Sequence, residues 1–204
     1  MDTRTSYDTV AAAYADLTRE ALAAEPYLRA GLGIFAELVA AAGGGPVADV
    51  GCGPGHVTAH LRGLGVDAFG LDLSPGMVAL ARREHPGVRF GAGSMTDLPL
   101  ATGSVAGLIA FWSLIHVPDD RVPGVLGHFR RVLRPGGPLL VGFHAGDSAS
   151  IKTSGYGGHP MNVLVRRRRP EVVADRLRAA GFAVDAVLSL DVDSARPGAI
   201  IIAR

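Results

Sequence analysis

The strongest local pattern in the chain is Pro46-Val47-Ala48-Asp49-Val50-Gly51-Cys52-Gly53-Pro54-Gly55-His56-Val57. An apolar run ends in an acid, breaks into alternating glycines and is followed by a helical pattern. This order predicts a buried parallel strand, a tight turn and the N-terminus of a helix. Glycine has no Cβ and can adopt positive φ, so a ligand can lie against the bare backbone of such a turn. The sequence therefore predicts a nucleotide-like ligand here.

Two cofactor families bind at such a turn. The dinucleotide fingerprint G-x-G-x-x-G requires a third glycine at position 56, where this chain has His56. Asp49 lies two residues before the first glycine, where a carboxylate would repel a pyrophosphate but suits a cation. The segment Asp49–Gly55 resembles motif I of the class I S-adenosylmethionine (SAM)-dependent methyltransferases. The cofactor of that family carries an ammonium and a sulfonium.

The composition limits the kinds of protein that this chain can be. A chain of 204 residues with 48% hydrophobic residues is long enough for one domain with a full core. It has no apolar stretch of about 18 residues and no apolar signal-peptide core, so we expect no membrane partner. One cysteine fits a reducing cytoplasm, and a net charge of +1 argues against nucleic-acid binding.

A second acid supports an adenosine ligand. The apolar run 66–73 predicts a strand that ends in Asp72, about 20 residues after Asp49, where an acid accepts hydrogen bonds from ribose hydroxyls. Both cofactor families use such an acid, so it does not choose between them. Leu73-Ser74-Pro75-Gly76-Met77 resembles the methyltransferase pattern in which a serine caps the next helix. The resemblance places Leu73 at the cofactor and Met77 on the adenine, with a core Met77 as the alternative.

Three later segments also resemble the methyltransferase family. Gly93–Pro99 matches the segment whose first polar residue binds the adenine amino group; here that residue is Ser94, beside Met95. The apolar run 104–111 predicts a central strand, and the resemblance implies that Phe111 and Trp112 at its end wall the methyl group. Leu133-Arg134-Pro135-Gly136-Gly137 before an apolar strand resembles a late signature of the family.

The N-terminal region predicts a helical cover over the ligand. Helical spacing runs over residues 6–25 and 27–42, ahead of Gly43-Gly44-Gly45. Tyr7-Asp8-x-x-Ala11-x-x-Tyr14 resembles a segment of small-molecule methyltransferases in which a tyrosine closes over the cofactor. Tyr14 is therefore either a cofactor contact or a core residue. Arg29 either pairs with the cofactor carboxylate or is a solvated surface residue.

The candidate for chemistry at the end of the central strand is His116. The motif Trp112–Pro118 looks like the family's segment after the fourth strand, so His116 is either a base or substrate-orienting group, or a histidine bonded to backbone beneath the site. Asp49, with Gly51, Cys52, Gly53 and Gly55 of the turn, would place the methionine end of the cofactor. We interpret Cys52 as a small residue that the turn requires rather than as a nucleophile.

Residues 143–165 show no periodicity and are predicted to form a variable substrate loop. From it, His144, Tyr156 and His159 could reach a substrate or could lie in a polar surface lid. The histidine spacing does not match a metal site, and no metal is expected. The basic run Arg166–Arg169 is interpreted as a solvated strand end, with binding of an anionic substrate as the second interpretation and RNA as a distant third.

These patterns predict an α/β, Rossmann-like domain with a doubly wound seven-stranded sheet and helices on both faces. The resemblance implies the strand order 3-2-1-4-5-7-6 with strand 7 antiparallel. Within one domain we divide the chain into a helical cover (1–45), a cofactor-binding core (46–142), a variable substrate loop (143–169) and a C-terminal helix with two strands (170–204).

The resemblance implies methyl transfer from SAM to a small-molecule acceptor, with S-adenosylhomocysteine (SAH) as the product. A SAM- or SAH-binding module without activity is the alternative, because binding and catalysis share the same residues. An NAD(P)-dependent oxidoreductase is disfavoured by His56 and Asp49. The chain is expected to be a monomer or a homodimer.

Overall fold

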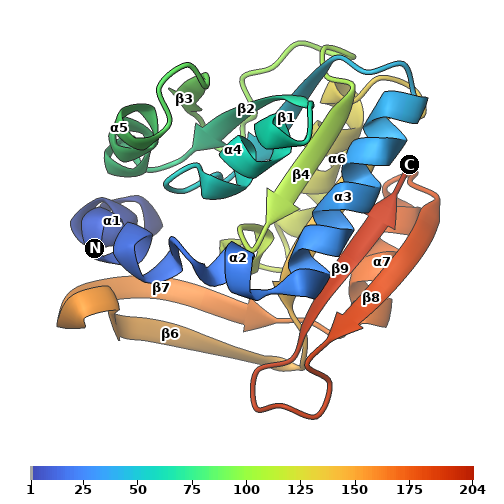
Figure 1. The fold of residues 1–204 in the computed structure, drawn as a ribbon. Helices are drawn as coiled ribbons and strands as arrows, with labels where there is room; N and C mark the ends of the chain where they lie inside the picture. The colour runs from blue at the N-terminus through green and yellow to red at the C-terminus, as the bar shows by residue number, and fades with distance from the viewer. Residues whose placement is uncertain (1) are drawn as a thin grey trace.

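The computed structural model describes residues 2–204 and contains a seven-stranded sheet in the order β3-β2-β1-β4-β5-β9-β8 (Figure 1). β9 is antiparallel to both β5 and β8, whereas the pairs from β3 through β5 are parallel. The strands are β1 (Pro46–Val50), β2 (Asp67–Asp72), β3 (Phe90–Ala92), β4 (Gly107–Phe111), β5 (Leu139–His144), β8 (Val184–Leu190) and β9 (Gly198–Ala203). The predicted order is confirmed, with β8 and β9 as its sixth and seventh strands.

The helices lie where the apolar periodicity places them, with bounds that differ by a few residues from the prediction. The predicted first helix is divided in two, because Arg19 and Glu20 form a turn. The helices are α1 (Thr3–Thr18), α2 (Ala21–Ala24), α3 (Pro26–Ala41), α4 (His56–Gly63), α5 (Pro75–Glu84), α6 (Val122–Val132) and α7 (Pro170–Ala179), with short 3₁₀ turns η1 (Leu114–His116) and η2 (Tyr156–Gly158).

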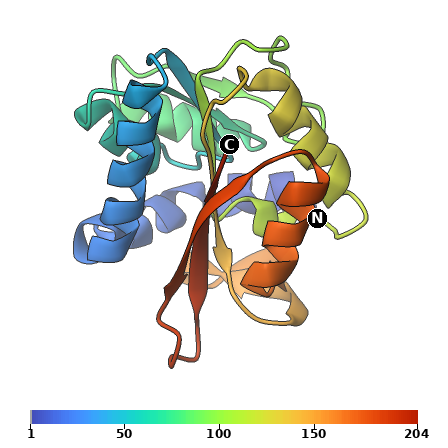
Figure 2. The same ribbon diagram turned by 90° about the vertical axis from the view of Figure 1, so that its right-hand side faces the viewer.

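Helices cover both faces of the sheet, which Figure 2 shows edge-on between them. On one face α3 contributes Phe35 to a core that includes Ile109 of β4. On the other face α6 and α7 contribute Phe129 and Leu177 to a core that includes Leu108. Neighbouring residues of a strand point to opposite faces, so a strand between two helical layers must be apolar throughout. This is the reason for the continuous apolar run in β4.

The turn after β1 requires glycine at position 51, because a larger residue would clash with a neighbouring segment. Gly51 has φ +80°, and a Cβ there would lie 2.2 Å from Cβ of Ser113. Ser113 follows β4 and is itself held to β1, because its hydroxyl donates a 2.7 Å hydrogen bond to the carbonyl of Val50. Close approach of these two segments brings the ends of β1 and β4 together at one edge of the sheet.

The segment after β5 is not the irregular loop that the sequence predicted. It forms an antiparallel hairpin of β6 (Ser148–Gly155) and β7 (His159–Arg167), a second sheet of its own. The hairpin lies beside α1, below the carboxyl ends of the central strands (Figure 1). Most of β6 is exposed, so it lacks the alternation of buried and exposed residues from which a strand is predicted.

α1 is fixed to the rest of the molecule at both of its sides. Asp8 accepts hydrogen bonds from the Ser74 hydroxyl (2.5 Å) and the Gly76 N–H (2.8 Å) at the start of α5. The buried hydroxyl of Ser6 accepts one from the backbone N–H of Asn162 in β7 (2.9 Å). α1 therefore spans the gap between α5 and the hairpin and covers the carboxyl edge of the sheet.

The interpretation of Arg166–Arg169 as a solvated strand end is wrong for Arg168, whose side chain is only 5% exposed. Its guanidinium donates to the carbonyls of Leu114 (3.1 Å) and Val117 (2.6 Å) and to Asp119 (2.9 Å). Arg166 and Arg176 also bind Asp119. The basic run is thus partly a buried brace between the hairpin and the segment after β4, which sequence alone cannot distinguish from a charged surface.

We expect Arg168→Met to lower the free energy of unfolding by about 3 kcal/mol, because it leaves two buried carbonyls without donors and removes a partner of Asp119. Urea unfolding followed by circular dichroism measures this loss. Arg178→Met is the matched control, since Arg178 pairs with Asp175 on an exposed surface and should change stability by less than about 0.5 kcal/mol. Equal effects of the two substitutions would contradict the bracing role.

Candidate cofactor and acceptor site

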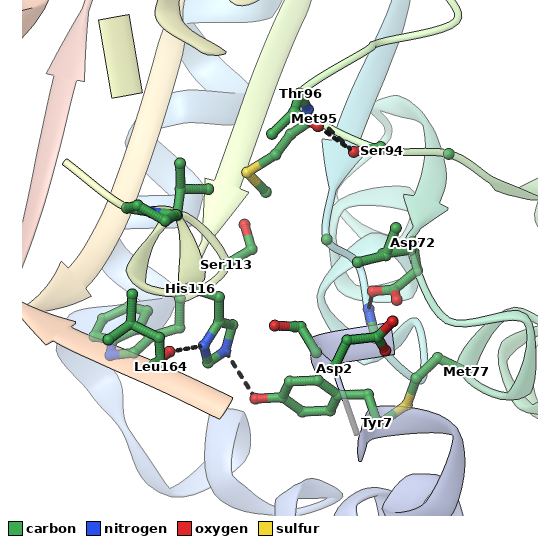
Figure 3. Close-up of a pocket in the computed structure, with 18 of the residues that line it drawn as sticks. Asp2, Tyr7, Asp72, Met77, Ser94, Met95, Thr96, Ser113, His116 and Leu164 are labelled. Atoms are coloured by element: carbon green, nitrogen blue, oxygen red, sulfur yellow. Dashed lines mark hydrogen bonds between the residues drawn. The ribbon is translucent and has the colours of Figure 1, made fainter. Parts of the chain in front are cut away.

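A cleft of about 670 Å³ lies between the carboxyl ends of the parallel strands on one side and α1 with the hairpin on the other (Figure 3). Open α/β sheets bind ligands at this edge. Its walls come from α1, the turns after β1, β2, β3 and β4, and the hairpin. The predicted site residues that line it are Tyr14, Gly51, Gly53, Asp72, Leu73, Met77, Ser94, Met95, Phe111, Trp112 and His116.

Asp72 organises the part of the cleft next to β2. Its carboxylate accepts 2.8 Å hydrogen bonds from the backbone N–H groups of Gly53 and Ser74, and so joins the glycine turn to the start of α5. Burial raises the pKa of Asp72, while these two N–H groups oppose the increase. Ser74 also caps α5 through the N–H of Met77, as predicted. Asp72 and Met77, two of the predicted adenosine residues, thereby come to line the same part of the cleft.

The opposite wall of that part comes from the turn after β3. Ser94 and Met95 both line the cleft, as expected from the sequence. The Ser94 hydroxyl lies 2.8 Å from the hydroxyl of Thr96, which also lines the cleft and was not singled out from the sequence (Figure 3). Two neighbouring hydroxyl-bearing residues therefore line this part of the cleft.

A second, smaller cavity of about 160 Å³ adjoins the cleft and shares five of its lining residues. These shared residues are Tyr14, Gly51, Gly53, Phe111 and Trp112. Asp49, Cys52 and His56 line only the small cavity. The two cavities together therefore form one elongated site, with Asp72 in the larger part and Asp49 in the smaller.

Asp49 is 1% exposed, and only one of its carboxylate oxygens has a partner. Thr58 donates a 2.6 Å hydrogen bond to Oδ2, whereas Oδ1 has no partner among the described residues. Burial raises the pKa of Asp49 to about 7, against the lowering effect of Thr58. A buried carboxylate with a free oxygen is costly unless a cation or donor meets it.

Cys52 is a space-filling residue of the turn. A Cβ added to Gly70 of β2 would lie only 2.6 Å from the Cys52 sulfur. The thiol therefore occupies space that a side chain at this glycine would need. Burial raises the pKa of Cys52 well above its usual value, and the neighbouring acids add to this. The thiol therefore stays protonated at neutral pH, which disfavours a nucleophilic role.

Tyr7 and His116 form a hydrogen-bonded pair at the other end of the cleft (Figure 3). His116 Nδ1 lies 2.8 Å from the carbonyl oxygen of Leu164, and Nε2 lies 2.8 Å from the Tyr7 hydroxyl. A carbonyl can only accept, so Nδ1 carries the hydrogen and Nε2 accepts the hydrogen of the tyrosine. Burial lowers the pKa of His116, so that the ring is neutral. His116 therefore contacts backbone and also lines the cleft, and its role as a base or substrate-orienting group stays a prediction.

Trp112 forms the wall between the two cavities in an unusual backbone conformation. Its φ is +54°, in a region that non-glycine residues rarely adopt. The indole lies over Gly142 of β5, where a Cβ would be 2.6 Å from the ring, and Nε1 donates a 3.2 Å hydrogen bond to Nδ1 of His144. Strained residues of this kind concentrate at functional sites.

The structure does not bring several predicted residues to the cleft. The Arg29 guanidinium donates to the carbonyls of Leu22 and Ala23 at the end of α2. His144 contacts the Trp112 indole from behind, Tyr156 stacks edge-on against Tyr14 at 4.7 Å, and His159 is exposed at the tip of the hairpin. Of these, His144 and Tyr156 touch wall residues rather than the cavity.

Gly55 is also absent from both cavity walls. It has φ +85° as the N-cap of α4, and a Cβ there would lie 2.6 Å from the Phe90 ring. This glycine is therefore required by the turn and by packing against β3.

Several residues that line the cleft were not predicted as site residues from the sequence, and Tyr7 was noted only as part of a motif. From the N-terminal segment and the hairpin these are Asp2, Thr3, Ile151, Asn162 and Leu164, and from the segments after β3 and β4 they include Thr96, Ser113 and Arg121. The seven-residue spacing of Tyr7 and Tyr14 indicates that both tyrosines lie on one side of α1. No comparable pattern pointed to the hairpin residues, because their strand pairing was not predicted.

Across residues 2–204, no group of three or more His, Cys, Asp or Glu side chains is arranged to hold a metal ion. No helix in that range is both long and apolar enough to cross a bilayer.

Comparison with known proteins identifies a methyltransferase domain over residues 47–137. Malonyl-[acyl-carrier protein] O-methyltransferase of Pectobacterium atrosepticum is 37% identical over 113 residues, which cover 55% of this chain and 44% of that protein. Demethylmenaquinone methyltransferase of Beutenbergia cavernae is 41% identical over 95 residues, covering 47% and 39%. The chain thus matches less than half the length of these curated relatives.

Among solved structures, the DhpI–SAH complex superimposes with a TM-score of 0.73 at 23% sequence identity, covering 98% of this chain and 93% of that one. This similarity shows a shared fold. The matched domain contains the turn after β1, Asp72 and the Leu133–Gly137 segment, which are the motifs that carried the resemblance in the sequence. Residues 47–137 are thus similar to a methyltransferase domain in sequence, and nearly the whole chain shares its fold with the DhpI structure.

Proposed function

We propose that this protein transfers a methyl group from SAM to a small-molecule acceptor. The observation that supports this most directly is the pair of connected cavities with one acid in each. Asp72 lies where hydroxyl groups of a ribose would bind, and Asp49 lies in the smaller cavity, where a cationic end would bind. An elongated ligand with an adenosine at one end and an ammonium at the other matches both acids.

The unpartnered oxygen of Asp49 tests the fit of the cofactor. Oδ1 is buried and has no donor within the described part of the chain, and an ammonium would supply one. A dinucleotide would instead place its phosphates at the glycine turn, close to this buried acid, and would be repelled. The residues therefore fit SAM and SAH better than NAD(P). On this basis Asp49, Gly51 and Gly53 hold the methionine end, while Asp72, Met77, Ser94 and Met95 hold the adenosine.

SAM supplies a methyl group that its positively charged sulfur already activates. The protein must then orient the acceptor and exclude water. α1 and the hairpin close the cleft from outside, and Trp112 and Phe111 form the wall beside the junction of the two cavities. These features provide a dry, shaped space on the side of the junction where Tyr7 and His116 lie.

Tyr7 and His116 can remove a proton from the acceptor. An acceptor hydroxyl or amine that donates to the Tyr7 oxygen can pass its proton to that oxygen, while the tyrosine's own proton moves to Nε2 of His116. The imidazolium keeps its Nδ1–H on the Leu164 carbonyl. The lone pair left on the acceptor is the one that takes the methyl group. The pair thus links the acceptor to a neutral base.

The acceptor end of the cleft favours a small, partly apolar molecule. Val117, Pro118, Ile151 and Leu164 line it, with the Tyr7–His116 pair as the central polar feature. The name of one relative refers to a quinone precursor and that of another to a carrier-bound acid. A net charge of +1 gives no general attraction to nucleic acids.

The competing function is a SAM- or SAH-binding module without activity. Titration calorimetry with SAM, SAH and NADH fixes the ligand, and release of SAH in the presence of a panel of phenols, carboxylic acids and amines tests catalysis. Micromolar binding of SAM and SAH together with acceptor-dependent SAH release is the expected result. Binding without release from any acceptor would support the module, and binding of NADH alone would overturn the proposal.

Asp72→Ala should weaken SAH binding by about 10-fold or more, because a charged hydrogen-bond acceptor for the ribose is removed. Calorimetric titration measures the change in Kd. Asp97→Ala is the control, since Asp97 is exposed in the turn after β3 and lines neither cavity. A similar loss in both variants, or none in Asp72→Ala, would contradict the role of Asp72.

Asp49→Asn should make the ligand-free protein more stable at about pH 8, by about 2–4 kcal/mol. The pKa of Asp49 is about 7 in the fold against 3.8 in the unfolded chain, so its favourable contribution is present below about pH 4 and is lost as pH rises through 7. Asparagine removes this loss and can still accept from Thr58. Thermal unfolding at about pH 4 and pH 8 measures it, and an unchanged pH dependence would argue against a buried, ionising Asp49.

His116→Ala should retain SAH binding within about twofold, because His116 lies at the acceptor end, and should lower turnover by about 10²-fold or more if it accepts the acceptor's proton. Tyr7→Phe should show the same separation of binding from turnover. Steady-state SAH release with an acceptor from the panel provides the measurement. Unchanged turnover in His116→Ala would eliminate His116 as the base.

A further inference from the structure

The small cavity contains a histidine that the predicted site did not include. Its lining residues with ionisable side chains are Tyr14, Asp49, Cys52 and His56. Burial raises the pKa of Tyr14 and of Cys52, so both remain neutral at pH 7. Asp49 is therefore the anionic group of this cavity, and His56 is its remaining titratable group.

The cofactor's amino-acid end carries a carboxylate as well as an ammonium, and its carboxylate needs a partner in this cavity. Arg29, which the sequence suggested for that role, is held by the carbonyls of Leu22 and Ala23. The hydroxyl of Thr18, which also lines the cavity, donates to the carbonyl of Tyr14 (2.9 Å). These two donors are already engaged within the described part of the chain.

His56 is placed to supply the missing donor. It is the first residue of α4, whose N-cap is Gly55, so no side chain caps the helix. The first N–H groups of a helix and its dipole favour an anion at this position. The Nδ1 atom of His56 is buried without a partner among residues 2–204, as is Oδ1 of Asp49. Burial lowers the pKa of His56 to about 4, so the ring is neutral at pH 7 and offers one N–H.

We propose that His56 binds the carboxylate of the cofactor's amino-acid end, while Asp49 binds its ammonium, so that the small cavity recognises a zwitterion. This inference rests on the proposed function, because it assigns one end of SAM or SAH. It explains why a histidine stands where a dinucleotide-binding turn would have its third glycine. It also accounts for two buried polar atoms that have no hydrogen-bond partner among residues 2–204.

The test compares SAH with two truncated ligands. S-adenosyl-3-thiopropylamine is SAH without its carboxylate, and 5′-methylthioadenosine lacks the whole amino-acid end. His56→Leu should weaken SAH by about 10-fold or more and leave the binding of both truncated ligands within about twofold. His56→Gln should recover part of the SAH affinity, because its amide N–H can replace that of the ring. Titration calorimetry measures all three ligands.

His60→Leu is the matched control, since His60 lies one turn further along α4 and lines neither cavity. Thermal unfolding of each variant shows whether it is folded, and 5′-methylthioadenosine binding shows that the adenosine part is intact. Equal weakening of SAH and S-adenosyl-3-thiopropylamine, or no weakening of either, would overturn the role of His56. Failure of the wild-type protein to bind SAH would overturn the proposed function itself. That outcome differs from failure of the His56 proposal, in which the wild-type protein still binds SAH.

Discussion

The site depends on how closely the chain can approach itself at the carboxyl edge of the sheet. The Asp72 carboxylate holds the N–H groups of Gly53 and Ser74, and the carbonyl of Leu71 accepts from Gly51 and Cys52. These bonds fix the turn after β1 against the end of β2. The same turn meets Ser113 after β4, which only a glycine at position 51 permits. Three strand ends thus share one small volume, and both cavities open from it.

Burial determines the charge of the groups around this volume. Removing a carboxylate from water raises its pKa, and removing an imidazole from water lowers its pKa. The Asp49 carboxyl group therefore ionises only near pH 7, whereas the rings of His56 and His116 are neutral there. A cationic ligand group beside Asp49 would favour its ionised form, which links ligand recognition to the protonation of this acid.

The outer wall of the site is made by segments far apart in the sequence. α1 contacts α5 through Asp8 and β7 through Ser6, and Tyr7 between them reaches His116. Arg168 braces the base of the hairpin against the segment that carries His116. The acceptor end is therefore positioned by the N-terminal helix and by the hairpin together. Buried apolar side chains reinforce these hydrogen bonds, since Val10 of α1 packs with Met161 and Val163 of β7.

The sequence by itself determined the largely parallel sheet, the glycine turn and the positions of Asp49 and Asp72 at strand ends, because each depends on local residues or on a pattern of apolar strands, whereas the strand order followed from the resemblance to a known family. It could not determine the hairpin, since β6 is largely exposed and has no alternating pattern. It also could not show that Arg29 turns to α2, that Arg168 is buried, or that Tyr7 meets His116. Those outcomes depend on which backbone groups and side chains the fold brings within hydrogen-bond distance, and only the tertiary structure decided them.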